Sequence, residues 1–333
     1  MPIYPLAPHT DDELCAEFVG SSPAFSTTLA QIRRVATSEA PVLIEGETGS
    51  GKELAARAVH YWGVRNAGPF VPVNCGALPD HLLEAELFGH ERGAFTDAKL
   101  ARRGLVAEAN GGTLFLDEVD ALSAKAQVTL LRFLQDQRYR PLGSSRELFT
   151  NARLIAATNR PLADATQQGR FRGDLMYRLK ILHLELPPLR ERSGDAVQLA
   201  QHFITRLCAK YRLPLKCLDA ATLVWIGQHH WPGNVRELEN WVHRALLMSD
   251  GLAINARLDM TSPKPNAPSN AEIDNFQRAK AAAVTRFERD YVLTVMRQTG
   301  GNVTRAAQIA GKERRAFGKL IKKHGIDRES LGD

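Results

Sequence analysis

The sequence of 333 residues lacks the features that define several classes of protein. It has no apolar run near the ~18 residues that a membrane-spanning helix needs. Its first residues, MPIYPLAPHTDDEL, lack the basic start and the apolar block of a secretory signal. We therefore expect a cytoplasmic protein without a membrane partner.

Cysteine is scarce, and its spacing excludes two further classes. Cys15, Cys75, Cys208 and Cys217 form no CxxC pair and have no His neighbours at metal-ligand spacing. Neither a zinc site nor a disulfide framework is indicated, so we expect reduced, structural thiols. The 44% of apolar and 24% of charged residues are typical of globular protein and argue against disorder throughout. Internal repeats are also lacking.

An excess of positive charge is present at one end only. Residues 271–333 contain 13 Lys and Arg against 8 Asp and Glu, whereas the preceding residues contain 30 against 29. Such asymmetry is typical of a nucleic-acid-binding end, although a solvated charged face would produce it as well.

Strand and helix patterns alternate between residue 20 and about residue 251. The apolar runs at 41–46, 70–75, 112–118 and 152–159 are separated by helical patterns, which predicts a mostly parallel α/β sheet. Three helical patterns follow at 193–211, 219–231 and 234–248, with no strands between them. They predict a helical subdomain.

Composition divides the chain further. The segment 260–272 is rich in Pro, Ser and Asn, which marks a linker. We expect a short leader at 1–19 that leaves no room for a sensory domain, an α/β subdomain at 20–185 and a helical subdomain at 186–252. A linker at 253–272 and an all-helical domain at 273–333 complete the division.

A phosphate-binding loop directly follows the strand at 41–46. Glycines let the backbone N–H groups turn toward phosphates, and Lys52 can reach the β and γ phosphates of a nucleotide. Glu53 stands where a Ser or Thr usually binds magnesium, so other groups must hold the metal. A chance glycine-rich loop is the alternative for this motif alone. The motif comprises Gly46, Glu47, Thr48, Gly49, Ser50, Gly51, Lys52 and Glu53.

Polar residues at two other strand ends suit ATP hydrolysis. Asp117 can hold Mg²⁺ through its water shell, and Glu118 can activate the attacking water. Thr158 and Asn159 could sense the γ-phosphate, with a plain turn as the alternative. Arg170, Arg172 and Arg178 could stabilise a neighbour's transition state, or form a solvated basic face. The loop and the acidic pair together predict an ATPase.

Eight motifs in chain order resemble those of a known family. They are GETGSGKE, VNCGAL, ELFGHERGAFTDA, GGTLFLDEVD, AATNR, FRGDLMYRL, LPPLRER and WPGNVREL. Over about residues 19–248 they closely resemble the AAA+ domain of bacterial sigma-54-dependent transcriptional activators, the enhancer-binding proteins. The C-terminal helices resemble the family's Fis-type helix-turn-helix. The resemblance implies an AAA+ P-loop parallel sheet with a helical lid subdomain, followed by an all-α DNA-binding domain.

The same resemblance implies roles for individual residues. Lys52 would bind the phosphates of ATP, Asp117 the Mg²⁺, and Glu118 would be the catalytic base. Asn74 matches the family's switch residue, which holds this glutamate, and Thr158 and Asn159 match the first sensor. Arg172 and Arg178 match the arginine fingers, and Arg236 matches the second sensor. ATP would lie between protomers, which implies a ring, typically a hexamer.

The stretch ELFGHERGAFTDAK places Phe95 among charged residues. A lone Phe usually folds into the core. The resemblance implies instead that Phe95 and Thr96 are exposed and contact sigma-54 in the RNA polymerase holoenzyme. Asp97 replaces the family's glycine, and we expect it to narrow the conformations of the loop.

Six basic residues and one Glu occupy residues 312–323. Asn302 or Thr304 can start the preceding helix and Gly311 can form the turn. Ala316, Phe317, Leu320 and Ile321 are expected to pack inward. The resemblance implies a dimer on double-stranded DNA at upstream enhancer sites, with a merely charged face as the alternative. The proposed DNA contacts are Lys312, Arg314, Arg315, Lys319, Lys322 and Lys323.

The favoured function is an ATP-driven remodeller of sigma-54 RNA polymerase at the bacterial nucleoid. One alternative is a DNA-binding regulator whose ATPase domain serves assembly only, which ATP turnover would exclude. Another is a general AAA+ unfoldase or DNA-processing motor, which the Phe95 loop and the C-terminal reader disfavour. Without a sensory domain, we expect control by expression level or by a separate regulatory protein.

Overall fold

The computed structural model describes residues 17–77, 80–95, 98–249, 251–254, 288, 291, 292, 295, 296, 299 and 302–323. The chain divides into two compact units, residues 1–261 and residues 262–333, which are described separately. None of the described helices is long and apolar enough to span a membrane.

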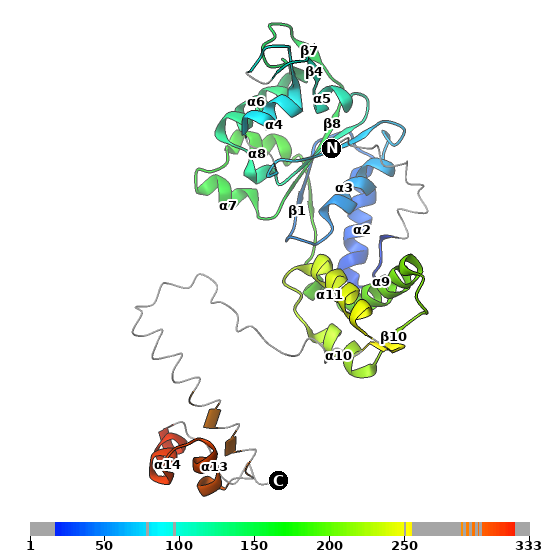
Figure 1. Cartoon of the computed structure of the whole chain (residues 1–333). Coiled ribbons are helices and arrows are strands. Elements are labelled where there is room, and N and C mark those ends of the chain that lie inside the picture. The colour runs from blue at the N-terminus through cyan, green and yellow to red at the C-terminus, as the bar shows by residue number, and fades with distance from the viewer. Residues whose placement is uncertain are drawn as a thin grey trace. The chain divides into compact units, whose positions relative to one another are not determined.

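A parallel sheet forms the centre of the first unit (Figure 1). Its spatial order is β2 (Phe70–Asn74), β5 (Thr113–Asp117), β8 (Arg153–Thr158), β1 (Val42–Glu45) and β9 (Leu182–Glu185). The four predicted strands are confirmed. The fifth strand, β9, was not predicted, because only Leu184 of its four residues is buried and the sequence pattern there is weak.

Helices cover both faces of this sheet, which explains the continuous apolar runs of its strands. Val42 and Ile44 of β1 pack toward α2 (Pro23–Ala36) and α3 (Lys52–Tyr61). Leu43 points the other way, because successive side chains of a strand alternate. On that second face lie α4 (Asp80–Phe88), α5 (Leu105–Glu108), α6 (Ala124–Asp136), α7 (Leu162–Gln167) and α8 (Gly173–Leu179) (Figure 1).

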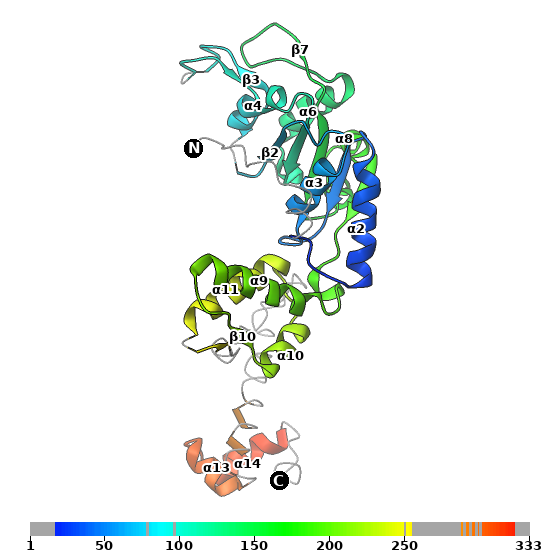
Figure 2. The same ribbon diagram turned by 90° about the vertical axis from the view of Figure 1, so that its right-hand side faces the viewer.

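The three predicted lid helices are confirmed as α9 (Asp195–Tyr211), α10 (Ala220–Gln228) and α11 (Asn234–Met248) (Figure 2). They pack around the buried Trp231 and Trp241, and the short 3-10 helix η2 (Leu189–Glu191) joins them to the sheet. The expectation that no strand lies between them is wrong. β10 (Cys217–Leu218) pairs with β11 (Ala253–Ile254), and a strand of two residues is too short to show a period in the sequence.

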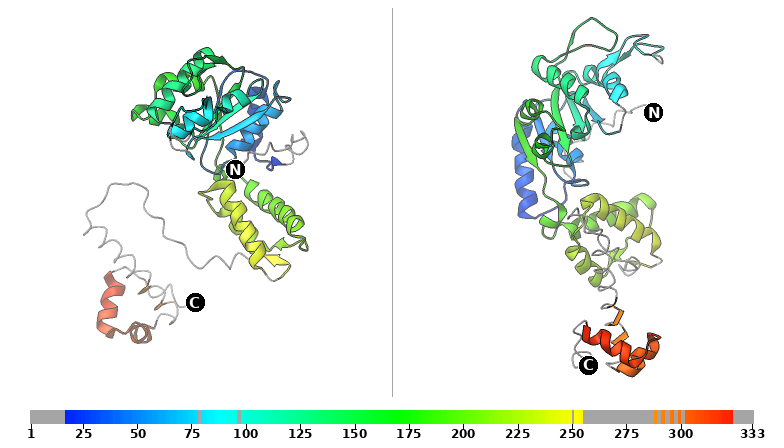
Figure 3. Two further views of the ribbon diagram at one scale, coloured as in Figure 1. Left: turned by 45° about the horizontal axis from the view of Figure 1, so that its top comes forward. Right: turned by 90° about the vertical axis from the view of Figure 1, so that its left-hand side faces the viewer.

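Two hairpins lie together at the end of this unit that is farthest from α9 to α11 (Figures 1, 2 and 3). One pairs β3 (Gly89–His90) with β4 (Arg102–Arg103), and the other pairs β6 (Arg138–Tyr139) with β7 (Leu148–Phe149). The backbone of Leu142 bonds to Gly89 and to Glu91 at 2.9 Å, so the second hairpin braces the first. The Phe95 loop connects β3 and β4.

In the second unit, α13 (Val303–Ile309) and α14 (Arg314–Lys323) pack around the fully buried Phe317. Asn302 caps α13 by accepting the N–H groups of Thr304 and Arg305. The turn at Gly311 has φ +60°, a conformation that glycine adopts without strain. Phe317 and Ile321 pack inward and Leu320 does so in part, but Ala316 is exposed and its expected burial is wrong.

Candidate functional site

The loop between β1 and α3 folds around the amino group of Lys52. Gly49 has φ +77° and Gly51 φ +101°, conformations that side chains rarely tolerate. Lys52 Nζ donates to the carbonyls of Gly46 at 2.8 Å and Glu47 at 3.1 Å, and to Asn159 Oδ1 at 2.6 Å. The side chain begins at the first residue of α3, so the lysine lies where the N–H groups of a helix start face an anion.

The buried Lys52 and two half-buried carboxylates, Asp117 and Glu118, lie close enough at this loop to affect one another. Burial lowers the pKa of Lys52, while the carboxylates of Asp117 and Glu118 act in the opposite direction. Burial also raises the pKa of Asp117, with Lys52 opposing it. Ser50 Oγ is buried and has no hydrogen-bond partner among the described residues. An unsatisfied hydroxyl beside a lysine fits a phosphate ligand.

Glu118 follows β5 in the left-handed conformation, with φ 54°. A non-glycine residue held there stores strain, which is common at functional sites. Its Oε1 accepts from Asn159 Nδ2 at 3.4 Å. Asn74, expected to hold Glu118, accepts instead from the N–H of Gly76 at 2.9 Å. A Cβ on Gly76 would lie 2.4 Å from Glu118 Oε2, so a glycine at 76 leaves room for the glutamate.

Two other predicted residues point away from Lys52. The hydroxyl of Thr158 lies 2.8 Å from Asp120 Oδ1, so only Asn159 of the expected sensor pair reaches the lysine. Glu53 is exposed and pairs at 2.7 Å with Arg57 one turn along α3. Its charge nevertheless contributes to the raised pKa of Asp117, after the larger effects of burial and Glu118.

The lid contacts the phosphate loop directly. Glu47 pairs with Arg190 at 2.6 Å, and Asn234 Nδ2 donates to Glu47 and to the carbonyl of Thr48. The N–H of Val235 donates to the carbonyl of Gly49 at 3.1 Å. Arg236 is exposed and lies beside the loop, since a Cβ on Gly49 would come within 3.0 Å of its Cβ. Its charge helps to lower the pKa of Lys52, after the larger effect of burial.

Beside the phosphate loop lies an apolar cavity, which the sequence did not predict. Its walls come from the segment before α2, from α2 itself, from the phosphate loop and from the lid. Phe18, assigned to a leader, packs against Trp62 with ring centroids 5.3 Å apart. The cavity is lined by Glu17, Phe18, Val19, Phe25, Thr28, Leu29, Ile32, Ser50, Gly51, Leu54, Ala55, Leu186, Pro187, Arg192, Leu199 and Val235.

The three arginines of the stretch GRFRGDLMYRL do not join this site. Arg172 pairs with Asp174 at 2.8 Å, and Arg170 bonds to Gln168. Arg178 is exposed and makes no hydrogen bond or ion pair with any described residue. All three lie at or near α8, on the sheet face opposite α3 (Figure 1).

Phe95 is half-buried, so the expectation that its side chain is exposed is wrong. Its ring lies against that of His90, with centroids 5.0 Å apart. Ala94 packs on Gly143 of the bracing hairpin, where a Cβ would come within 2.9 Å. Thr96 and Asp97 lie outside the described residues.

The basic residues proposed to meet DNA all belong to the second unit and all are exposed. They are Lys312, Arg314, Arg315, Lys319, Lys322 and Lys323. Lys323 is paired with Glu288 at 2.7 Å. Arg314, Arg315 and Glu313 line a groove together with Val303 and Gly318, so the start of α14 is open to a ligand.

Known proteins and families are similar to this chain over nearly its whole length. A sigma-54 interaction domain matches residues 18–185, and an AAA+ ATPase lid domain matches residues 190–270. The transcriptional regulatory protein GlrR of Escherichia coli K12 is 40% identical, over 96% of this chain and 71% of GlrR. The transcriptional regulatory protein ZraR of the same organism is 43% identical, over 90% of this chain and 67% of ZraR.

A solved structure shares the fold. NtrX from Brucella abortus, crystallised in complex with ADP, superposes with a TM-score of 0.68 at 32% identity. The superposition covers 93% of this chain and 69% of NtrX.

Proposed function

Because the chain belongs to the family of sigma-54-dependent transcriptional activators, we propose that ATP hydrolysis at the Lys52 site drives remodelling of sigma-54 RNA polymerase in closed promoter complexes. Its sigma-54 interaction domain is an AAA+ ATPase, and sigma-54-dependent activation is powered by that ATPase. The site assignment depends above all on Asn159, which contacts both Lys52 and Glu118.

In the proposed mechanism the chain's own residues divide the work. Lys52 exchanges its carbonyl partners for the β and γ phosphates, and Ser50 donates its unsatisfied hydroxyl to a phosphate oxygen. Glu118 takes the proton of the attacking water, and Asn159 holds the carboxylate beside the γ-phosphate. The apolar cavity at Phe18 and Val19 receives the adenine base.

We propose Asp117 as the protein's contribution to a Mg²⁺ site. Its half-buried carboxylate is an oxygen ligand that this ion prefers, and a bound cation would stabilise the charged carboxylate, whose pKa burial raises. The described residues contain no group of three or more His, Cys, Asp or Glu able to hold a metal. The ion would therefore be shared with phosphate oxygens and water, and it would neutralise charge on the phosphates.

The chemistry can be tested with two variants of the full chain. Glu118→Ala should still bind ATP but lose at least about 100-fold in turnover, as expected for removal of a general base. Lys52→Ala should weaken ATP binding itself. Glu239→Ala, which removes an exposed carboxylate on α11, is the control and should hydrolyse ATP normally. Full turnover by the Glu118 variant would refute the assignment.

We further propose Phe95 and Thr96 as the contacts for sigma-54. The hairpins that hold this loop lie at the end of the unit away from the lid, which supports a role outside hydrolysis (Figure 2). Thr96→Ala should hydrolyse ATP normally but fail to retain sigma-54 when trapped with ADP and a metal fluoride. If the unaltered protein also fails to retain it, the coupling to sigma-54 is wrong.

Three further features belong to this proposal. The exposed basic face of α14 supports binding to upstream double-stranded DNA, and hence action at the nucleoid in the bacterial cytoplasm. The position of Arg172 and Arg178 at α8, on the sheet face opposite α3, supports a ring, up to a hexamer, in which they act on a neighbour. Control by a separate regulatory protein is proposed from the sequence alone.

A further inference from the structure

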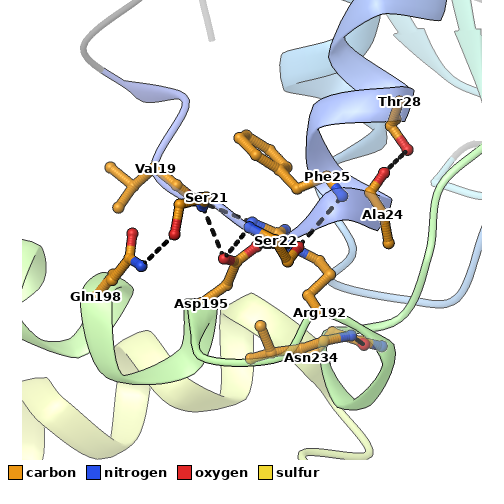
Figure 4. Close-up of polar contacts among 11 residues, drawn as sticks. Val19, Ser21, Ser22, Ala24, Phe25, Thr28, Arg192, Asp195, Gln198 and Asn234 are labelled. Atoms are coloured by element: carbon orange, nitrogen blue, oxygen red, sulfur yellow. Dashed lines mark hydrogen bonds and ion pairs between the residues drawn. The ribbon is translucent and has the colours of Figure 1, made fainter.

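The segment just before α2 forms part of the wall of the apolar cavity beside the phosphate loop, through Phe18 and Val19. Residues 18–22 belong to no helix or strand. Their position therefore depends on side-chain contacts rather than on a backbone ladder. The hydrogen bonds among these contacts come from the lid side of the first unit (Figure 4).

One carboxylate holds this segment. Asp195, the first residue of α9, accepts the N–H groups of Ser21 and Ser22 on Oδ1 at 2.8 and 2.9 Å. Its Oδ2 accepts the hydroxyl of Ser22 at 2.8 Å, and the same hydroxyl oxygen caps α2 by accepting from Phe25. The starts of α2 and α9 thus meet at a single side chain (Figure 4).

Arg192 holds the segment from the other side. Its Nε donates to Asp195 Oδ2 at 2.9 Å, and its Nη2 donates to the carbonyl of Val19 at 2.9 Å. Its guanidinium lies over the ring of Phe25, 4.3 Å from the centroid, and lines the cavity. The carboxylate is fully buried and the arginine is 7% exposed.

A buried ion pair is a costly way to stabilise a fold, since apolar residues of similar volume often serve as well. What an apolar pair could not do is bind the N–H groups and the carbonyl of residues 19 to 22. Burial alone would raise the pKa of Asp195, but the hydrogen bonds from Ser21, Arg192 and Ser22 hold it below its usual value. The hydrogen bonds of the Asp195 carboxylate and the Arg192 guanidinium therefore hold residues 19–22 in place.

We propose that Arg192 and Asp195 are positioning residues for the nucleotide, fixing residues 18–22 so that Phe18 and Val19 form the wall against which the adenine base binds. This inference rests on the proposed ATP site. It assigns the pair to the base side of that site, whereas Lys52, Asp117 and Glu118 serve the phosphate side. The lid is tied to the base wall through the same contacts.

The two sides of the site can be separated with two ligands, ADP and inorganic tripolyphosphate, titrated calorimetrically into the full chain. Arg192→Lys keeps the charge but loses the paired donors, and should weaken ADP about tenfold, equivalent to about 1.4 kcal/mol. Tripolyphosphate has no base, and its affinity should change less than about twofold. In turnover, KM for ATP should rise while kcat is retained.

Gly20→Ala is a second variant that leaves both charged side chains in place. A Cβ at Gly20 would lie 2.6 Å from Asp195 Oδ2 and 2.9 Å from Arg192 Nη2, so it should produce the same selective loss of ADP. Arg206→Lys makes the same chemical change at an exposed arginine of α9 and should alter neither affinity.

Unchanged ADP affinity in Arg192→Lys or Gly20→Ala, at an unchanged melting temperature, overturns the inference. An equal loss for both ligands does so too, because it indicates a general effect on the fold or on the phosphate loop. If the unaltered chain binds neither ligand, the proposed ATP site itself falls and the inference falls with it.

Discussion

Two titratable side chains, those of Arg153 and His60, are buried at the edge of the sheet away from the nucleotide site. Arg153, the first residue of β8, is buried and donates at 2.9 Å to the carbonyl of Val35 in the last turn of α2. Burial lowers its pKa to about 10. His60 in the last turn of α3 is also fully buried, and its Nδ1 shares a hydrogen with Thr113 Oγ1 at 2.8 Å.

His60 makes stability depend on pH. Burial, with smaller effects of Arg153 and Arg57, lowers its folded pKa to about 4, although a backbone bond to Gly68 opposes the shift. The unfolded chain therefore binds the proton first as pH falls below 6.5. Stability contributed by neutral His60 is fully present above pH 6.5 and is lost toward pH 4, by up to about 3 kcal/mol.

Urea unfolding at pH 7.5 and pH 5 measures this dependence. His60→Gln should be less stable than the parent at pH 7.5 but should lose less stability on going to pH 5. His230→Gln changes a histidine whose side chain is exposed, and should keep the full dependence. Parallel curves for the parent and the His60 variant would show that other groups set the pH response.

Residue identities at the nucleotide site could be predicted from sequence only where a motif is local. Lys52 and Asn159 belong to two such motifs and lie 2.6 Å apart in the fold, although 107 positions separate them. The part of the cavity wall formed by Phe18 and Val19 was not predicted, because these residues contact Trp62 and Arg192, far along the chain. We expected Asn74 to hold Glu118. In the structure Asn74 accepts a hydrogen bond from the N–H of Gly76, and Glu118 accepts one from Asn159.

At the scale of elements, strands buried on both faces and long amphipathic helices were predictable. β1, β5 and β8 carry continuous apolar runs because helices pack on each side of them. β9, with exposed His183 and Glu185, carries no such run. The two-residue strands β10 and β11 depend on pairing across the lid, which no local pattern can indicate.

The helix α14 allows a test of DNA binding at the same scale. Lys322 is exposed and forms no ion pair with any described residue, whereas Lys323 is paired with Glu288. Lys322→Ala should weaken binding to specific and unrelated duplexes alike and reduce the salt slope by about one, as loss of one phosphate contact does. Fluorescence anisotropy at several salt concentrations measures the slope.

The contrast within α14 provides the control. Lys323→Ala should have a smaller effect on affinity, because its ammonium already neutralises a carboxylate. A change in Lys322→Ala confined to one DNA sequence would indicate contact with a base edge rather than with a phosphate.

At the scale of the whole molecule, the features considered above lie at two opposite ends of the first unit. The lid and the nucleotide site occupy one, and the braced hairpins with Phe95 occupy the other (Figures 1 and 2). Between them, Glu45 at the end of β1 accepts the N–H of Leu162 at 3.0 Å and pairs with Lys180 and His183. This buried carboxylate joins the strand before the phosphate loop to the start of α7, to the end of α8 beside Arg178, and to β9.

We expect Arg178 to contribute to hydrolysis in a neighbouring subunit, because α8 and α3 lie on opposite faces of the sheet. A subunit with Arg178→Ala retains Glu118, and a subunit with Glu118→Ala retains Arg178. When the two inactive proteins are mixed, some interfaces combine the intact Glu118 of one subunit with the intact Arg178 of the next. Random assembly makes about a quarter of the interfaces complete at an equal ratio, so ATPase activity should peak there.

Mixing Arg178→Ala subunits with subunits that carry both substitutions supplies no intact Arg178, so no interface is complete and no activity should return. Activity that stays at the level of the separate variants at every ratio would assign Arg178 a role within its own subunit and remove the support for a catalytic ring.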